Sequence, residues 1–250
     1  MDFPALQAHL VAEAARFKAA VSAAPADAPV PSCPEWTTTD LLDHLTETYD
    51  HKIQSMRFMR DPSGDFRIKR PGGPAAQFDG ALADLLAEFG DRGPDTLSYT
   101  WYGPDQTVGF WIRRMAHETL VHRVDAELAA GAPIGLVDPE LALDGIDEML
   151  MVMLSWASRV DSAWMIDTIT ANDGLEVAFD TGSASWTLLV APNGIAILDG
   201  VAPTARATVH GDPGEMLLWL WRRLPVEALR IEGDQAKAAQ LYELVTEFAQ

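Results

Sequence analysis

A strongly helical segment in the middle of the chain, residues 107–131, carries ionisable side chains along one face. The helical spacing i, i+4, i+7, i+11, i+14 joins Trp111, Met115, Glu118, His122 and Asp125. The face begins apolar and becomes ionisable without changing direction, and burying a carboxylate there is costly unless a partner compensates its charge. Glu118 and His122 lie four residues apart, so their side chains can converge on one ion.

A second predicted helix, which runs from the capping-box residue Thr37 to about Met59, offers a matching ligand. His44 stands on its apolar stripe beside Leu41 and Leu45. One His and a Glu-x-x-x-His pair provide nitrogen and oxygen donors that suit zinc or another first-row divalent ion. Three protein ligands leave coordination positions open, which is typical of catalytic sites. The predicted metal ligands are His44, Glu118 and His122.

The same residues also have ordinary structural interpretations. A single buried His is more often hydrogen-bonded in a core than bound to metal, and a Glu–His pair at this spacing is common on surfaces. His117 points about 100° away from the Glu118 face and is predicted not to be a ligand. Asp125 either orients the His122 imidazole or faces solvent. Cys33 is expected to be a packed thiol, because no basic neighbour in sequence would activate it.

The composition limits the classes of partner. The 250 residues carry a formal net charge of −19, from 37 acidic and 18 basic residues. Such a surface repels phosphate backbones and anionic membranes, so neither a nucleic-acid nor a membrane partner is expected. A pocket for an anionic substrate would need a local positive charge. The single cysteine, the absence of a signal-peptide core and the lack of a long apolar run together predict a cytoplasmic protein.

Further helices are expected around this pair in the first half of the chain. One begins near Pro4 and ends in the SAAPADAP segment, and the proline-rich stretch that follows cannot be helical. Phe78–Phe89 is a third helical pattern, and Pro139 opens another helix after the metal-binding one.

After about Trp156 the apolar period changes from helical to alternating. Strands are expected over the segments MIDTITA, LEVAFD, WTLLVA, GIAILDG, ARATVHG and LRIEG. Asn193-Gly194 is a hairpin signal, and two late helices are expected to be capped by Asp212 and Asp234. Helices followed by strands favour an α+β fold with two domains, residues 1–158 and 159–250.

Three motifs, VPSCPEWTTTDLLDHL, RRMAHETLVHRVDAE and LLWLWRRLPVEALRIEGD, resemble the mycothiol-dependent maleylpyruvate isomerase family of actinobacteria. The resemblance covers nearly the whole chain in the expected order. It implies a DinB-like four-helix bundle that holds a metal over residues 1–158. It also implies a small α/β domain similar to sterol carrier proteins over residues 159–250. The family's metal ligands fall on His44, Glu118 and His122, the trio indicated by helical spacing.

The resemblance implies a metal-dependent isomerase or S-transferase with mycothiol as cosubstrate. A divalent ion, most simply zinc, lowers the pKa of a bound thiol. The thiolate then adds to the double bond of a small electrophile such as maleylpyruvate, permits rotation and leaves. Retention of the adduct gives thiol transfer instead. The alternative is a non-catalytic metal or small-ligand binding protein with a carrier-like domain. Metal-dependent hydrolysis is a third possibility, although no obvious general base stands near the ligands.

Arginines are the candidates for binding an anionic substrate, because a guanidinium matches a carboxylate bidentately. Arg223 matches an Arg in the family's motif and is the predicted catalytic residue, with Arg222 beside it. Arg222 and Arg223 are explained equally well as cations that complement the dipole at the C-terminus of a helix. Arg113 and Arg114 adjoin the metal face but are expected to face solvent. Glu35 stands where the family has Gly, and its carboxylate would narrow or recharge the pocket rim against an anionic substrate.

Overall fold

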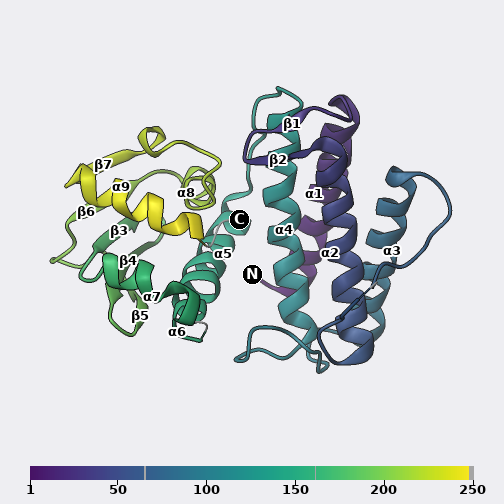
Figure 1. The fold of residues 1–250 in the computed structure, drawn as a ribbon, viewed down its shortest axis with the longest axis horizontal. Coiled ribbons are helices and arrows are strands. Elements are labelled where there is room, and N and C mark those ends of the chain that lie inside the picture. Colours follow the sequence, from purple (N-terminus) through teal and green to yellow (C-terminus); the bar gives the residue numbers. More distant parts are fainter. Residues whose placement is uncertain (65, 161, 248–250) are drawn as a thin grey trace. The chain divides into compact units, whose positions relative to one another are not determined.

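The computed structural model describes residues 1–64, 66–160 and 162–247. The chain divides into two compact units, Met1–Gly135 and Leu136–Gln250. Figure 1 shows long helices in the first unit, and a sheet with helices in the second. The predicted α+β class, with a helical part before a sheet-containing part, is therefore confirmed. Among the described residues, no helix is both long enough and apolar enough to cross a bilayer.

The first unit is a bundle of four long helices: α1 (Phe3–Ala23), α2 (Thr38–Phe58), α3 (Pro74–Arg92) and α4 (Val108–Ala129). The capping box predicted at Thr37 is present, with Thr37 and Asp40 each accepting from the other's backbone N–H. Thr107 caps α4 by accepting from the backbone N–H of Phe110. The α4 helix packs against α1 and α2 and is buried along most of its length. It is therefore the central helix of the bundle.

A buried arginine fixes α4 against α1. The side chain of Arg123 is fully buried, and its Nε donates to Glu13 Oε2 at 2.7 Å. Its Nη1 donates to Glu127 Oε2 at 2.7 Å and to the carbonyl oxygen of Gly135 at 3.1 Å. Burial of a guanidinium requires carboxylates that match its charge, and Glu13 and Glu127 do so here, although Arg123 Nη2 has no hydrogen-bond partner among the described residues. The network therefore sets how α4 is placed on α1.

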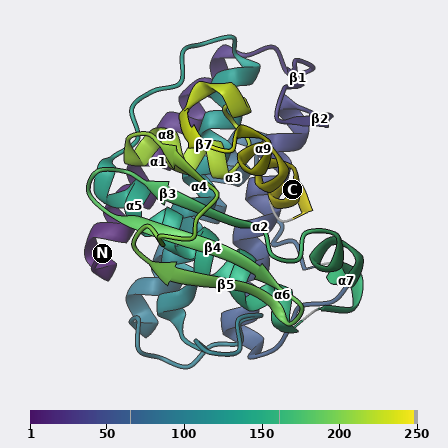
Figure 2. The same ribbon diagram turned by 90° about the vertical axis from the view of Figure 1, so that its left-hand side faces the viewer.

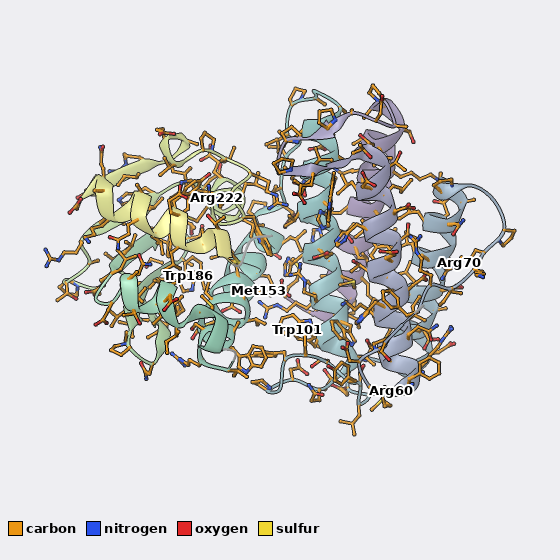
Figure 3. All side chains as sticks on the ribbon, in the orientation of Figure 1. Arg60, Arg70, Trp101, Met153, Trp186 and Arg222 are labelled. Carbon is orange, nitrogen blue, oxygen red and sulfur yellow. The ribbon has the colours of Figure 1, made fainter. Side chains whose placement is uncertain are left out.

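Two connections complete the first unit. The proline-rich segment forms a short antiparallel pair, β1 (Pro29–Val30) and β2 (Cys33–Thr37), which packs on α2 and α4. Arg70, labelled in Figure 3, lies in the connection between α2 and α3. Its Nη2 lies 2.7 Å from carboxylate oxygens of both Asp50 and Asp84. These ion pairs hold the connection against both helices.

The second unit contains a mixed sheet with the strand order β5-β4-β3-β6-β7, in which only the β3–β6 pair is parallel. The strands are β3 (Glu176–Asp180), β4 (Ser185–Ala191), β5 (Gly194–Asp199), β6 (Ala207–His210) and β7 (Arg230–Gly233). The predicted hairpin at Asn193-Gly194 joins β4 to β5, and Gly194 has φ 115°. Figure 2 shows β3, β4 and β5 side by side.

Helices pack around this sheet. They are α5 (Pro139–Glu148), the π-helix η1 (Met149–Trp156), α6 (Ala157–Val160), α7 (Ser162–Ala171), α8 (Pro213–Leu220), η2 (Val226–Ala228), α9 (Gln235–Leu244) and η3 (Val245–Glu247). Asp212 and Asp234 cap α8 and α9 as predicted. The α9 helix packs on β3, β6 and β7, whereas α7 packs on β4 and β5. The core of this unit lies between the sheet and these helices.

The strand predicted over MIDTITA is wrong, because this segment belongs to α7. Its alternating apolar and β-branched residues imitate a strand pattern. Met165 and Ile169, four residues apart, are both buried, whereas Ile166 is 60% exposed. The buried pair forms a helical stripe against β4 and β5, so tertiary packing overrides the local pattern.

The division between the compact units falls at Gly135/Leu136, earlier than the predicted boundary at 158/159. The reason is that α5 packs against α8 and continues into η1, so it groups with the sheet. The boundary at 158/159 stays a prediction of where the chain separates into independently folding parts.

Candidate metal centre

His44 on α2 and Glu118 and His122 on α4 converge, with one ligand atom of each within 4.8 Å of the others. Nε2 of His44 lies 3.3 Å from Glu118 Oε1, and Nε2 of His122 lies 3.2 Å from the same oxygen. Ligand atoms at the corners of a tetrahedron around zinc are about 3.3 Å apart. These two spacings, and the donor set of two imidazoles and a carboxylate, therefore fit one divalent metal ion.

The two helices are held in register beside these residues. Tyr49 Oη and Thr119 Oγ1 lie 2.6 Å apart in a buried hydrogen bond between α2 and α4. Thr119 is the residue after Glu118, and its hydroxyl also donates to the carbonyl oxygen of Met115. This hydrogen bond fixes the position of α2 along the axis of α4, so it also determines which α4 residues face His44.

Asp125 orients the imidazole of His122. Its Oδ2 lies 2.9 Å from His122 Nδ1, and its Oδ1 accepts a hydrogen bond from Ser32 Oγ at 2.5 Å. An imidazole that donates from Nδ1 to a carboxylate keeps its Nε2 lone pair for a metal. Asp125 is fully buried, so the orienting interpretation holds and the solvent-facing one does not. Ser32 lies in the β1–β2 turn, where no periodic signal pointed to it.

Arg114 holds the carboxylate ligand from the other side. Its Nη2 donates to Glu118 Oε2 at 2.5 Å, and only 5% of its side chain is exposed. The prediction that Arg114 faces solvent is therefore wrong. Burial raises the pKa of Glu118, but Arg114 and His122 outweigh that effect and hold it well below its usual range. The spacing of four residues between Arg114 and Glu118 was the available signal.

The charges around His122 favour its protonated form. Burial lowers the pKa of this imidazole. The carboxylates of Glu118 and Asp125 have the larger, opposite effect and raise the pKa to about 9. At neutral pH a proton therefore occupies the place between His122 and Glu118. A divalent cation held by these residues would take the place of that proton beside the same carboxylate.

Trp36 on β2 forms one wall of the site. Its ring centroid lies 4.5 Å from that of His44 and 6.1 Å from that of His122. Trp36 and His44 line an open pocket of about 440 Å³, which gives access to the His44 side of the site. The other lining residues are all acidic: Glu35, Asp40, Asp43 and Glu47. Glu35 therefore lies at this pocket, as the sequence comparison with the family suggested.

The remaining predicted residues lie apart from the converging trio. His117 is buried and lies outside the group of converging ligands. In the second unit, Arg222 Nη1 donates to the carbonyl oxygen of Tyr242 at 2.7 Å, and Figure 3 labels this residue. Arg223 Nη1 donates to the carbonyl oxygen of Trp221 at 2.7 Å, and the residue is 9% exposed. A catalytic role of Arg223 stays a prediction.

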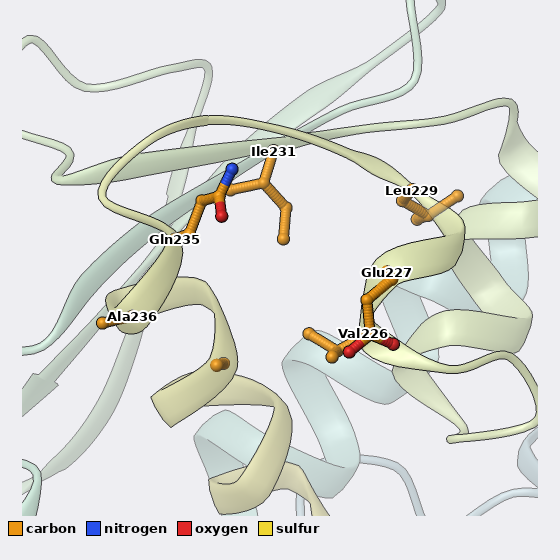
Figure 4. A pocket seen from close by; sticks show the side chains of 7 residues that line it. Val226, Glu227, Leu229, Ile231, Gln235 and Ala236 are labelled. Atoms are coloured by element: carbon orange, nitrogen blue, oxygen red, sulfur yellow. The ribbon is translucent and has the colours of Figure 1, made fainter.

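The second unit has a pocket of its own, shown in Figure 4. It has a volume of about 440 Å³ and lies among η2, β7 and the start of α9. Its lining residues are Val226, Glu227, Leu229, Ile231, Gln235, Ala236 and Ala239. Most of these side chains are apolar, and Glu227 and Gln235 are the polar ones.

A helical bundle with a His/Glu/His group, followed by a small mixed-sheet unit, defines the class of protein. Residues 8–127 match the mycothiol maleylpyruvate isomerase N-terminal domain, and residues 140–240 match the MDMPI C-terminal domain. The chain belongs to the mycothiol-dependent maleylpyruvate isomerase family, as the sequence motifs predicted. Membership supports, for the family as a whole, a function of the mycothiol-dependent maleylpyruvate isomerase type.

Two other comparisons add little to this assignment. No curated protein matches the chain. Among solved structures, the chain is similar to the UbiJ-SCP2 ubiquinone synthesis protein, with a TM-score of 0.32 and 18% sequence identity. That match covers 44% of this chain and 93% of the other.

Proposed function

We propose that this protein is a metal-dependent enzyme that uses mycothiol to isomerise a small electrophile about a carbon–carbon double bond. The observation that carries the proposal is the convergence of His44, Glu118 and His122 at ligand spacing. Family membership supports the choice of thiol. These residues would hold a divalent cation, with zinc the best match to the donors, and that cation would lower the pKa of a bound thiol.

The protein's own residues prepare the site for this chemistry. Asp125 holds His122 so that Nε2 faces the ligand centre. Arg114 keeps Glu118 ionised and engages Oε2, which leaves Oε1 for the cation. Trp36 covers one side of His44 and limits the approach to the open pocket beside it. The thiol and the electrophile therefore reach His44 from the pocket side.

The reaction balances without an oxidant or a reductant. The thiolate forms a C–S bond with one alkene carbon, and the alkene electron pair moves onto the conjugated carbonyl group. Rotation occurs about the bond that is now single. The electron pair then returns, the double bond forms again and the C–S bond breaks. If a proton is added to the adduct before the thiolate leaves, the same site performs thiol transfer.

Metal content tests the ligand assignment. Purified protein is expected to hold about one divalent ion per chain. His44→Ala, Glu118→Ala and His122→Ala should each lower this occupancy. His117→Ala is the matched control, because His117 is a buried histidine of the same helix outside the converging group. Equal metal loss in the control variant would refute the assignment.

Thiol binding tests the cosubstrate. Mycothiol is titrated calorimetrically into metal-loaded and metal-free protein, in two buffers of different ionisation enthalpy. Binding as thiolate releases a proton, so the proposal requires proton release in the metal-loaded protein and none in the metal-free protein. Metal-independent binding, or no binding at all, would contradict the role of the thiol.

A second candidate function is non-catalytic binding of an apolar ligand. The observation that favours it is the apolar pocket formed by η2, β7 and α9 in the second unit. Tight binding of an apolar fluorescent probe, weakened by Leu229→Glu and accompanied by no thiol-dependent turnover, would support this function instead. In both cases we place the protein in the cytoplasm, because its single cysteine cannot form an intramolecular disulfide.

A further inference from the structure

Lys52 on α2 carries a positive charge that forms no ion pair with a carboxylate of the residues that the structure describes. Its Nζ lies 4.8 Å from the ring centroid of Trp111 on α4 and 3.2 Å from Nδ1 of His51. His51 is itself engaged at Nε2, 3.3 Å from Asp61 Oδ1. An ammonium group has three donors, and the single imidazole nitrogen accepts one of them. Two donors of Lys52 are thus left for a ligand.

The charge of Lys52 interacts electrostatically with residues of the candidate metal centre. Burial lowers the pKa of Lys52 to about 8, while Glu118 raises it, Arg114 lowers it and Asp61 raises it. The ammonium form still predominates at neutral pH. Both the metal-site carboxylate and its arginine partner therefore act on this side chain.

The two helices place Lys52 at a defined distance from the ligands. They run antiparallel, since His44 faces Glu118 and His122 while Lys52 faces Trp111 farther back along α4. Trp111 lies seven residues before Glu118 on the same face, which corresponds to about 10 Å along the helix. A short unsaturated acid can bridge that distance.

The electrostatic setting makes this cation significant. The protein has a net charge of −19, and four carboxylates line the pocket beside His44. A carboxylate ligand is repelled by that surface unless a cation receives it. Arg114 is already paired with Glu118, whereas the Lys52 ammonium group uses one of its three N–H donors, toward His51.

We propose that Lys52 is a specificity-determining residue that binds a carboxylate of the substrate, whose double bond then lies toward His44, Glu118 and His122. The substrate class is a short unsaturated acid whose carboxylate lies about two helical turns from the metal ligands. Trp111 supports the aliphatic and ammonium parts of Lys52, and the remaining ammonium donors bind the carboxylate. This inference rests on the proposed function for the identity of the reacting bond, but not for binding of the anion.

Calorimetric titration of maleate, a short unsaturated diacid, tests the inference without any thiol. We expect Lys52→Met to weaken maleate binding about ten- to hundredfold, because a hydrogen-bonded charge is lost. Lys52→Arg should stay within a few-fold of the wild type. Lys69→Met is the matched control, because it removes the same charge from an exposed lysine of the same unit. The titrations are made with metal-loaded and metal-free protein, so that coordination of maleate to the metal is separated from binding at Lys52.

Lysine-selective ¹³Cε labelling provides a second readout, since the chain has only four lysines. The Lys52 signal is assigned by its loss in Lys52→Met. Maleate should shift this signal and raise the apparent pKa of Lys52 above about 8, because an anion stabilises the ammonium form. The groups that already act on this titration are His51, Asp61, Arg114 and Glu118.

Three outcomes would overturn the inference: wild-type affinity for maleate in Lys52→Met, an unresponsive Lys52 signal, or no maleate binding by the wild type. Failure of the proposed function looks different. Mycothiol then fails to bind in a metal-dependent way, while the effect of Lys52→Met on maleate binding persists.

Discussion

Replacement of Asp125 by Asn should weaken metal binding although Asp125 does not contact the metal. The Asn side chain has nearly the same shape, and its Oδ1 can still accept the hydrogen bond from Ser32. Its amide nitrogen, however, donates toward His122 Nδ1, where the carboxylate accepted at 2.9 Å. The imidazole must then carry its proton on Nε2, the atom that lies 3.2 Å from Glu118 Oε1. A ligand nitrogen with a proton cannot bind a metal.

The size of the effect depends on pH. Loss of such an outer hydrogen-bond partner typically costs about 10- to 100-fold in metal affinity, or about 1.4–2.7 kcal/mol. Asp125 also helps to raise the pKa of His122 to about 9, so its removal lowers that pKa and weakens proton competition at neutral pH. We therefore expect the full loss of affinity at pH 9 and a smaller loss at pH 7.

The assay is competition for zinc with a fluorescent chelator at the two pH values, with thermal unfolding of the metal-free variant as a check of folding. Asp95→Asn is the control, because it removes the same charge at an exposed position. Unchanged zinc affinity of Asp125→Asn at pH 9 would refute the argument from the imidazole tautomer. A loss of the same size in Asp95→Asn would show that only the net charge matters.

Three further predictions concern the whole chain. Metal affinity of the wild type should rise with pH up to about 9, about tenfold per unit, because His122 must lose its proton; a flat profile by chelator competition would contradict this. Arg123→Ala should lower the free energy of unfolding in urea by about 3–5 kcal/mol, since Oε2 of the buried Glu13 loses its cation and only the partly exposed Arg16 at Oε1 remains. The exposed ion pair removed in Arg57→Ala should cost less than about 1 kcal/mol, and equal costs would argue against the buried network. Limited proteolysis should cut preferentially within residues 155–165 and leave a helical N-terminal fragment, whereas preferential cuts inside α2 or α4 would contradict the bundle.

Local signals predicted most of the elements, although not the α7 helix, and the three converging residues. The capping box at Thr37 sets where α2 begins, and its start together with the helical period determines that His44 faces α4. On α4, the spacing of Glu118 and His122 determines that both side chains lie on one face. These properties depend on backbone geometry within one helix, so a sequence can encode them without knowledge of the tertiary fold.

The residues around the trio depend on how distant segments meet, and they were not predictable in the same way. Trp36 and Ser32 reach the site because the β1–β2 pair packs on α2 and α4. The proposed role of Lys52 depends on its position over the ring of Trp111, which lies on another helix. The same limit explains α7, where a pattern suited to a strand forms a helix because Met165 and Ile169 find a surface to cover.

The ligand spacing of the candidate site has a consequence for the choice of ion in the proposed function. Glu118 Oε1 lies 3.2 and 3.3 Å from the two imidazoles, and Arg114 and Asp125 hold Glu118 and His122 in these positions. In small zinc-finger domains, by contrast, much of the metal's binding energy is consumed by folding. A finished site of two nitrogens and one oxygen follows the general affinity order of divalent ions, in which copper exceeds zinc. In the proposed function, the supply of metals in the cell at the moment of loading would then decide which ion the protein carries.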